Sequence, residues 1–273
     1  MISALILTFN EEIILPKCLE ALDFVDEIVA FDSFSTDKTI KIAEQFGAKI
    51  VQRKFDNYAK QRNVALKSVS EKTDWVLMVD ADEIVSPELR VEIIQLCVQK
   101  DNPISLYRVR RKDIFQNKWI KHSSGYPTWF GRLFKNGTVS VEREINEEYH
   151  TNGKIGNLQE HLIHYPFNKG IEWWFWKHNR YSSMEAKTLV QELNEKPKLK
   201  NLFSSDPTIR RKAQKGFSFS LPMRPFIVFI AFYFLRFGFL DGKAGYTFCK
   251  LRKTYEWMID LKIKELKELN SKK

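Results

Sequence analysis

The chain has 273 residues, of which 44% are hydrophobic and 29% are charged, and this composition excludes a disordered or collagen-like protein. Its net charge of +10 is uneven, because residues 166–273 carry 22 Lys and Arg against 10 Asp and Glu, whereas residues 1–165 carry 22 against 24. The three cysteines are too few and too widely spaced for a disulfide framework or a cysteine metal site.

Short apolar runs alternate with helical patterns through residues 1–110. Strands are expected at 2–7, 27–31, 48–52, 75–79 and 105–110, with helices at 12–22, 36–46, 58–69 and 86–97. The last helix opens with Ser86 as N-cap and Pro87 at the first helical position. The alternation predicts an α/β fold: a mostly parallel, Rossmann-like mixed sheet with helices on both faces, followed by a C-terminal helical extension. In such sheets ligands bind beyond the carboxyl ends of the strands.

The strongest chemical signal is the acidic run from Asp80 to Glu83, which follows an apolar strand directly. Side chains two apart on an extended chain point the same way, so Asp80 and Asp82 can face one ligand. Two close carboxylates repel each other unless a cation or a proton lies between them, and Mg²⁺ or Mn²⁺ is typically held by carboxylates and substrate phosphate oxygens. The run therefore predicts a metal–diphosphate site. The structural alternative is an acidic helix N-terminus, because Ser86 follows closely.

Polar residues also follow the first two predicted strands, in the runs from Thr8 to Glu12 and from Asp32 to Thr39. Hydroxyl and carboxylate groups there can bind a ribose, a base edge or a phosphate. Taken alone, the run from Asp32 to Thr39 is better explained by helix capping through Ser35 or Thr36. The agreement of three successive strand ends, each delivering polar groups to one rim of the sheet, favours a binding site.

These runs, in this order and at this spacing, resemble glycosyltransferase family 2, and in particular its bacterial lipopolysaccharide-core β-glucosyltransferase-like subgroup. The similarity covers about residues 1–250 and also includes the following positions: Gln61-Arg62-Asn63, Arg132-Leu133-Phe134, His164 and Gly238–Gly242. The resemblance implies a GT-A fold, a UDP-sugar donor, Mg²⁺ or Mn²⁺ as cofactor, and inversion at the anomeric carbon.

The resemblance also assigns site residues. It implies a donor-binding set made of Thr8, Asn10, Glu11, Asp32, Arg62, Asp80, Ala81 and Arg132. Within this set Asp32 would contact uracil or ribose, although many family members have a second acidic residue where this chain has Ser33. Asp80 would touch ribose or sugar, and Asp82 would hold the metal. Arg132 would orient the acceptor or the diphosphate, with a surface salt bridge as the structural alternative.

Inversion requires one base that deprotonates the acceptor hydroxyl as it attacks. The best local source is the acidic region from Glu142 to Glu148. The resembling subgroup often has a His-Glu pair here, and this chain has Asn146-Glu147. We therefore expect Glu147 to be the base, with Glu144 and Glu148 as alternatives. A solvated acidic turn is the structural alternative.

The sequence predicts two domains: residues 1–165 for nucleotide-sugar binding and catalysis, and a helical, basic, aromatic-rich region 166–273 for acceptor or membrane association. Pro225–Leu235 has eleven residues without charge, and a membrane span needs about 20. We expect a cytoplasmic protein whose C-terminal region lies on an anionic membrane surface, peripheral at the inner face of the cytoplasmic membrane. A helix buried against the catalytic domain or in a dimer is the alternative.

The predicted function is transfer of a hexose, with glucose suggested by the resemblance, to a glycan or glycolipid acceptor in lipopolysaccharide-core or surface-polysaccharide biosynthesis. One alternative is a metal-dependent phosphotransferase or nucleotidyltransferase. The haloacid dehalogenase type places its Asp-x-Asp after the first strand, whereas here it follows the fourth, and no phosphate-binding glycine loop follows the first strand. The other alternative is a non-enzymatic basic polyanion-binding protein. Nucleic acid is not an expected partner, because no nucleic-acid-binding motif is present.

Overall fold

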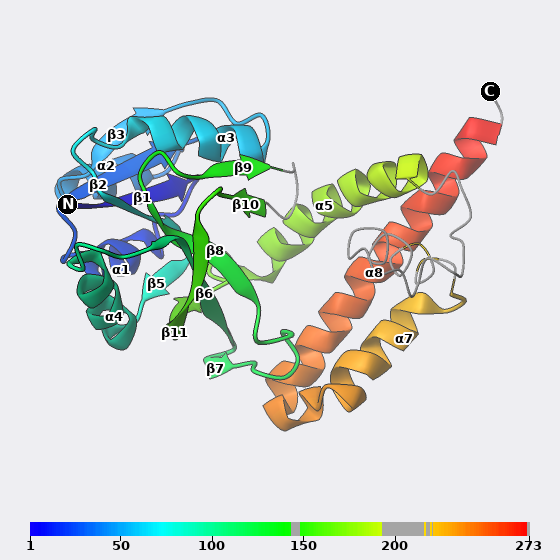
Figure 1. Cartoon of the computed structure of the whole chain (residues 1–273). Helices are drawn as coiled ribbons and strands as arrows, with labels where there is room; N and C mark the ends of the chain where they lie inside the picture. The colour runs from blue at the N-terminus through cyan, green and yellow to red at the C-terminus, as the bar shows by residue number, and fades with distance from the viewer. Residues whose placement is uncertain (143–147, 193–215, 217–218, 220, 272–273) are drawn as a thin grey trace. The chain divides into compact units, whose positions relative to one another are not determined.

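The computed structural model describes residues 1–142, 148–192, 216, 219 and 221–271 (Figure 1). The chain forms two compact units, the first made of Met1–Ile114 with Tyr126–Asn168 and the second of Phe115–Gly125 with Lys169–Lys273. This division falls near the predicted boundary at residue 165, but it also groups residues 115–125 with the C-terminal unit. Phe115 contacts Phe248, and Ser123 hydrogen bonds to Asp241, and neither contact can be inferred from sequence spacing.

The first unit is built on eight strands of a sheet that has nine over the described residues; the ninth, β7, falls in residues 115–125. Its strands follow the order β3-β2-β1-β4-β8-β6-β11-β5, and β7 pairs with β6. Their bounds are β1 Ile2–Thr8, β2 Glu27–Asp32, β3 Lys49–Gln52, β4 Trp75–Asp80, β5 Glu83–Val85, β6 Ile104–Phe115, β7 Lys118–Trp119, β8 Trp129–Lys135 and β11 Lys154–His164. A separate two-stranded ribbon pairs β9 (Ser140–Glu142) with β10 (Glu148–His150).

Strands β1 to β4 are mutually parallel, and β8 then lies antiparallel between β4 and β6. The predicted mostly parallel mixed sheet is confirmed. The expectation of a fifth strand at 105–110 was too short, because β6 continues to Phe115. The additional part of β6 contains charged residues. Two of them, Arg111 and Asp113, form ion pairs in the strand, so this segment is not a solvated loop.

Helices cover both faces of this sheet, as predicted. Four have these bounds: α1 Leu15–Glu20, α2 Thr39–Gln45, α3 Tyr58–Ala65 and α4 Pro87–Cys97, with a 3₁₀ turn η1 at Leu66–Ser68. Buried side chains of α1, α2 and α4 share one core cluster with Ala4 and Ile6 of β1, whereas Ala65 of α3 packs on the other face with Leu5. Ser86 caps α4 as expected, because its hydroxyl accepts a hydrogen bond from the Leu89 N–H at 3.2 Å.

The second unit is helical. Its elements are α5 Gly170–Glu192, α7 Arg224–Ile230, a π-helical turn η3 at Ala231–Leu235, a 3₁₀ turn η4 at Gly238–Asp241 and the long α8 Gly242–Ser271. Trp174 of α5 is buried, and Lys262 of α8 donates to the carbonyl and side-chain oxygens of Asn179, which ties α5 to α8. Over the described residues, no helix alone combines the length and apolar character of a membrane span; Arg224–Leu235 and Gly238–Ser271 meet those criteria only together, across a sharp bend.

Candidate active site

Three parallel strands deliver polar residues to one edge of the sheet. The register pairs Thr8 of β1 with Asp32 of β2, and Leu7 of β1 with Asp80 of β4. Thr8, Asp32 and Asp80 therefore end their strands side by side, as the sequence predicted. This is the edge at which α/β sheets bind ligands.

Asp32 organises the loop between β2 and α2. Its carboxylate is buried and accepts hydrogen bonds from the Thr8 hydroxyl at 2.9 Å, the Ser35 N–H at 2.8 Å and the Gln52 amide at 3.3 Å. Since both oxygens already accept hydrogen bonds inside the protein, the structure gives Asp32 a role in fixing the loop. Its predicted contact with uracil or ribose stays a prediction.

Asn10 and Glu11 join the first strand-end loop to the second. The side-chain oxygen of Asn10 accepts from the Thr36 N–H at 2.8 Å, and the Glu11 N–H donates to the Thr39 hydroxyl at 2.7 Å. The Glu11 carboxylate accepts from the Asn168 amide at 2.8 Å. The two predicted nucleotide-binding loops are therefore a single connected structure.

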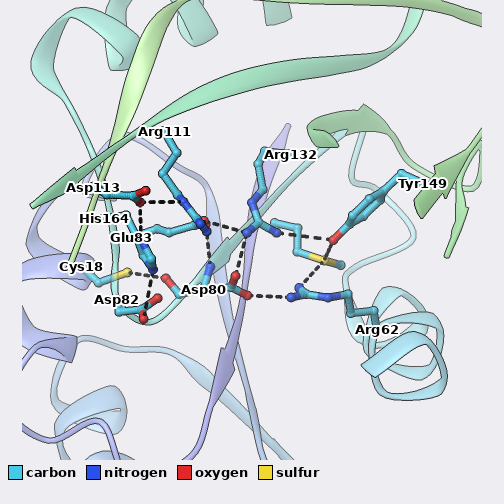
Figure 2. A network of polar contacts seen from close by, with 11 residues as sticks. Cys18, Arg62, Asp80, Asp82, Glu83, Arg111, Asp113, Arg132, Tyr149 and His164 are labelled. Carbon is cyan, nitrogen blue, oxygen red and sulfur yellow. Dashed lines mark hydrogen bonds and ion pairs between the residues drawn. The ribbon is translucent and has the colours of Figure 1, made fainter. Parts of the chain in front are cut away.

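Asp80 lies between two guanidinium groups (Figure 2). Arg62 of α3 contacts one carboxylate oxygen at 2.8 Å, and Arg132 of β8 contacts the other at 2.6 Å. Burial alone would raise the pKa of the Asp80 carboxyl, but Arg132 and Arg62 outweigh it and hold that pKa well below its ordinary value. The charge that a cation was expected to neutralise at Asp80 is thus neutralised by the protein itself. The alternative of a surface salt bridge for Arg132 is wrong, because its side chain is buried.

Glu83 holds the acidic turn in place. Its side chain is fully buried, accepts from the Asp80 N–H at 3.0 Å and pairs with Arg132 at 2.7 Å. Burial would lower the pKa of Arg132, but Asp80 and Glu83 raise that pKa well above its ordinary value. Ala81, predicted at the donor site, is buried within the same turn. The turn is therefore held by its third carboxylate as well as by its backbone.

Asp82 faces a different partner, His164 at the end of β11. The His164 Nε2 lies 3.4 Å from an Asp82 oxygen, and its Nδ1 lies 2.7 Å from an oxygen of Asp113 on β6 (Figure 2). The parallel register of β6 and β11 pairs His164 directly with Asp113. Burial and Arg111 oppose protonation of the imidazole, but Asp82 and Asp113 prevail, so the pKa of His164 is raised.

The contacts from Asp113 through His164 to Asp82 are of the kind that surround a bound divalent cation. Metal-binding histidines usually hold a carboxylate on their second nitrogen, which fixes the ring and its tautomer. Among the described residues, no group of three or more His, Cys, Asp or Glu side chains forms a complete metal site. Mg²⁺ and Mn²⁺ commonly take several of their ligands from phosphate oxygens and water, so Asp82 and His164 are compatible with such an ion as two protein ligands.

The structure brings most of the predicted site residues together and shows three further features that were not predicted. Thr8, Asp32, Asp80 and Arg62 converge as expected. Glu147, the predicted base, and Glu144 lie outside the described residues, and of Glu148 only the backbone is described. Three features were not predicted from the sequence: the roles of Asp113 and Arg111, and the contact of His164 with Asp82. A strand extended beyond residue 110 would have placed Arg111 and Asp113 on one face.

Comparison with known proteins gives a consistent picture. The profile described as Glycosyl transferase family 2 matches residues 3–160. An uncharacterized glycosyltransferase of Rickettsia felis is 32% identical over 203 residues, which cover 70% of this chain and 71% of the relative. The lipopolysaccharide core biosynthesis glycosyltransferase LpsC of Rhizobium meliloti is 27% identical over 215 residues, with 76% and 77% covered. Among solved structures, S. aureus TarS 1–349 has a TM-score of 0.44 at 16% identity, with 93% and 90% covered.

Proposed function

The chain belongs to glycosyl transferase family 2, and from that premise we propose that it is an inverting hexosyltransferase that uses a UDP-sugar. Its fold is of the GT-A type. The observation that carries the proposal is that two sets of contacts share the turn from Asp80 to Asp82 at the carboxyl edge of the sheet. Asp80 pairs with two buried guanidinium groups, and Asp82 faces His164, which Asp113 holds. Cationic groups and a metal-binding pair suit a leaving diphosphate. Family membership also sets the phosphotransferase and polyanion-binding alternatives aside.

The donor would lie along the joined strand-end loops. Thr8, Asn10 and Glu11 line the nucleotide pocket in this proposal, Asp32 holds the loop against the base or ribose, and Asp80 with Ala81 contacts ribose or sugar. Arg62 and Arg132 remain charged across the physiological pH range and are held by Asp80, so they stay oriented without a ligand. Preorganised donors of this kind stabilise developing charge because they need no rearrangement during the reaction.

Asp82 and His164 are the residues that would hold Mg²⁺ or Mn²⁺. Asp80 was predicted as a second ligand, but both of its oxygens are paired with guanidinium groups, so we assign that place to His164. When bound, the cation supplies positive charge beside the diphosphate. Asp113 keeps the imidazole oriented, and the buried Glu83 keeps the turn that carries Asp82 fixed.

Glu147 remains the proposed base, on the sequence argument alone. Glu147→Gln keeps the size and polarity of the side chain and removes its basicity. We expect the turnover number to fall by about 10²–10⁴-fold with little change in donor KM, because general-base catalysis typically contributes that much. Matched Glu144→Gln and Glu148→Gln proteins are the controls, and a larger loss in either would reassign the base.

The acceptor and the location are proposed from the relatives and the charge distribution. LpsC is a lipopolysaccharide core biosynthesis glycosyltransferase, and we propose a glycan or glycolipid acceptor of lipopolysaccharide core or surface polysaccharide. Residues 166–273 carry the chain's excess of positive charge. We propose that this region associates with acceptor or membrane, and that the protein is peripheral at the inner face of the cytoplasmic membrane.

Donor screening tests the proposed activity. Purified protein with Mn²⁺ or Mg²⁺ is incubated with UDP-, GDP- and CMP-sugars, and released nucleotide is measured by mass spectrometry. We expect UDP release from a UDP-hexose, with UDP-glucose first. Release from GDP- or CMP-sugars alone would contradict the donor assignment, and the absence of release from every donor, with several glycan acceptors present, would contradict the proposed reaction.

A further inference from the structure

The turn that joins α7 to α8 presents large apolar side chains to solvent. Five of its seven residues are exposed apolar side chains: Phe234 (53% exposed), Leu235 (74%), Phe237 (55%), Phe239 (43%) and Leu240 (58%). We call Phe234–Leu240 the apolar turn. The exposed faces of α7 and α8 continue it with Ile230, Ile227, Phe226 and Tyr246. A contiguous exposed apolar surface on a folded unit marks a place where another apolar phase or molecule binds.

The apolar turn is fixed from its inner side. Asp241, which follows it, is buried and accepts hydrogen bonds from the Ser123 N–H at 2.7 Å, the Ser123 hydroxyl at 2.7 Å and the His122 N–H at 3.0 Å. A Cβ at Gly245 would lie 2.3 Å from the Gly238 carbonyl oxygen, so the backbone segments touch directly. The inner space is thus filled by backbone and a satisfied carboxylate, and the apolar side chains point outward.

Within residues 221–253, every exposed charged side chain is positive. In residues 221–253 the exposed charged side chains are Arg236, Lys243, Lys250 and Arg252, whereas the one carboxylate, Asp241, is buried. A further cation, Arg224, is buried in ion pairs with Glu256 and Asp260, and Arg252 also pairs with Glu256, at 3.1 Å. We call the four exposed cations the basic collar.

Three of the four collar cations lie near aromatic rings of the same surface. The guanidinium groups of Arg236 and Arg252 lie 5.2 and 5.5 Å from the Phe232 ring centre, and the Lys250 ammonium lies 5.2 Å from that of Tyr246. Long cationic side chains that run along apolar surface and keep their charged ends in water are typical of a membrane interface.

We propose that the apolar turn inserts into the interfacial layer of a bilayer that contains anionic lipids, while the basic collar contacts the lipid phosphates. This inference rests on the membrane attachment included in the proposed function and names the surface that performs it. A second copy of the chain suits this surface poorly. Contact between the apolar turns of two copies would bring their basic collars together, and like charges would repel. Interfacial insertion of about 5–10 Å needs only the turn itself and no helix of spanning length.

Vesicle flotation of the full chain tests the inference. The wild type is mixed with vesicles of phosphatidylcholine alone or with phosphatidylglycerol added. We expect it to float with the anionic vesicles and to bind neutral vesicles at least tenfold less. Leu235→Ser/Leu240→Ser removes apolar surface at the apolar turn, and Lys243→Gln/Lys250→Gln removes collar charge. Each should reduce flotation with anionic vesicles at least tenfold.

Matched controls change equally exposed residues of the first unit. Val91→Ser/Val98→Ser and Lys72→Gln/Lys100→Gln should float like the wild type. Wild-type protein that stays with neither vesicle, or turn and collar variants that float as well as the wild type, would overturn the inference. So would a wild-type dimer, measured by light scattering, that becomes monomeric in the turn variant, since a second copy would then be the occupant.

A separate readout distinguishes this inference from the proposed reaction. The turn variant should release UDP from a UDP-sugar in solution at the wild-type rate and should melt at the same temperature, which also shows that it folds. Flotation that persists in a protein without UDP release would contradict only the reaction. UDP release without vesicle binding would contradict only the membrane surface.

Discussion

The strand-end site of the first unit and the apolar turn of the second are both unusual in which side chains they bury. The first buries charged side chains, and the second exposes apolar ones. At the strand ends, charged groups such as Arg132 and Glu83 are buried and paired with one another. At the apolar turn, side chains such as Leu235 and Leu240 are apolar and exposed. A buried charge or an exposed apolar cluster is more informative than the rest of a protein surface, because each carries a cost that folding alone does not require. The buried charges suit a site that stabilises charge, whereas the exposed apolar side chains suit a surface that binds an apolar phase.

Removing one member of the buried charge cluster should have the largest effect on stability. Arg132→Met leaves Asp80 and Glu83 without their shared partner, and we expect the free energy of unfolding to fall by about 3–5 kcal/mol, since an uncompensated buried charge remains. Denaturant titration measures the change. Arg90→Met, which breaks the exposed pair with Asp23, should cost far less. Equal losses in the two variants would show that the cluster is not a buried electrostatic unit.

The second unit holds a half-buried histidine, His178, whose surroundings disfavour its charged form. His178 stacks on Trp174 at 3.8 Å between ring centres and contacts Tyr255 edge-on, and burial lowers its pKa to about 4. The cations Lys177 and Arg252 further oppose its protonation. As pH falls from about 6.5 to about 4, the unfolded chain takes up a proton that the folded chain refuses, so stability is lost across that window, by roughly 3 kcal/mol in full.

A variant isolates that contribution. His178→Phe keeps an aromatic ring beside Trp174 and removes the titrating group, so its free energy of unfolding should fall less between pH 7 and pH 4.5 than that of the wild type. Parallel curves of unfolding free energy against pH for wild type and His178→Phe would rule out a lowered pKa at His178.

The smallest predicted effect is on metal use at the strand ends. Asp113→Asn keeps the hydrogen-bond geometry at His164 Nδ1 but removes the charge that orients the ring. We expect the Mn²⁺ concentration for half-maximal UDP release to rise by about 10–100-fold, as is typical for a lost carboxylate behind a metal-binding histidine. Asp101→Asn, an exposed substitution, is the control. An unchanged Mn²⁺ dependence would contradict the proposed role of Asp113 in orienting His164.

The sequence predicted the strand-end site because the local rules there agree. Apolar runs ending in Thr8, Asp32 and Asp80 give parallel strands whose carboxyl ends meet, and Ser86-Pro87 marks the helix that follows. It could not place Asp113, because charges at residues 110–113 resemble the end of a strand. In the structure Arg111 pairs with Glu83 and Asp113 pairs with His164, and both partners lie far away in sequence.

The C-terminal unit was harder to predict for a related reason. The run Phe217–Leu240 is recognisably apolar, but composition does not tell which side chains face inward. The answer depends on Asp241 and on Ser123, more than a hundred residues apart, which fix the apolar turn from inside. Long-range polar contacts thus decided what local patterns left open, both at Asp113 and at the apolar turn.

The most direct test of the central claim is UDP release from UDP-glucose with Mn²⁺, compared between the wild type and Asp82→Asn. We predict release by the wild type and at least about 10²-fold slower release by the variant, the loss typical when a group that stabilises developing charge is removed. The two proteins should melt at closely similar temperatures, because the introduced amide has the size of the carboxylate and can still hydrogen bond to His164, and the buried pairs of Arg132 with Asp80 and Glu83 are untouched. Equal rates of UDP release would contradict the assignment of this strand-end site as the catalytic centre.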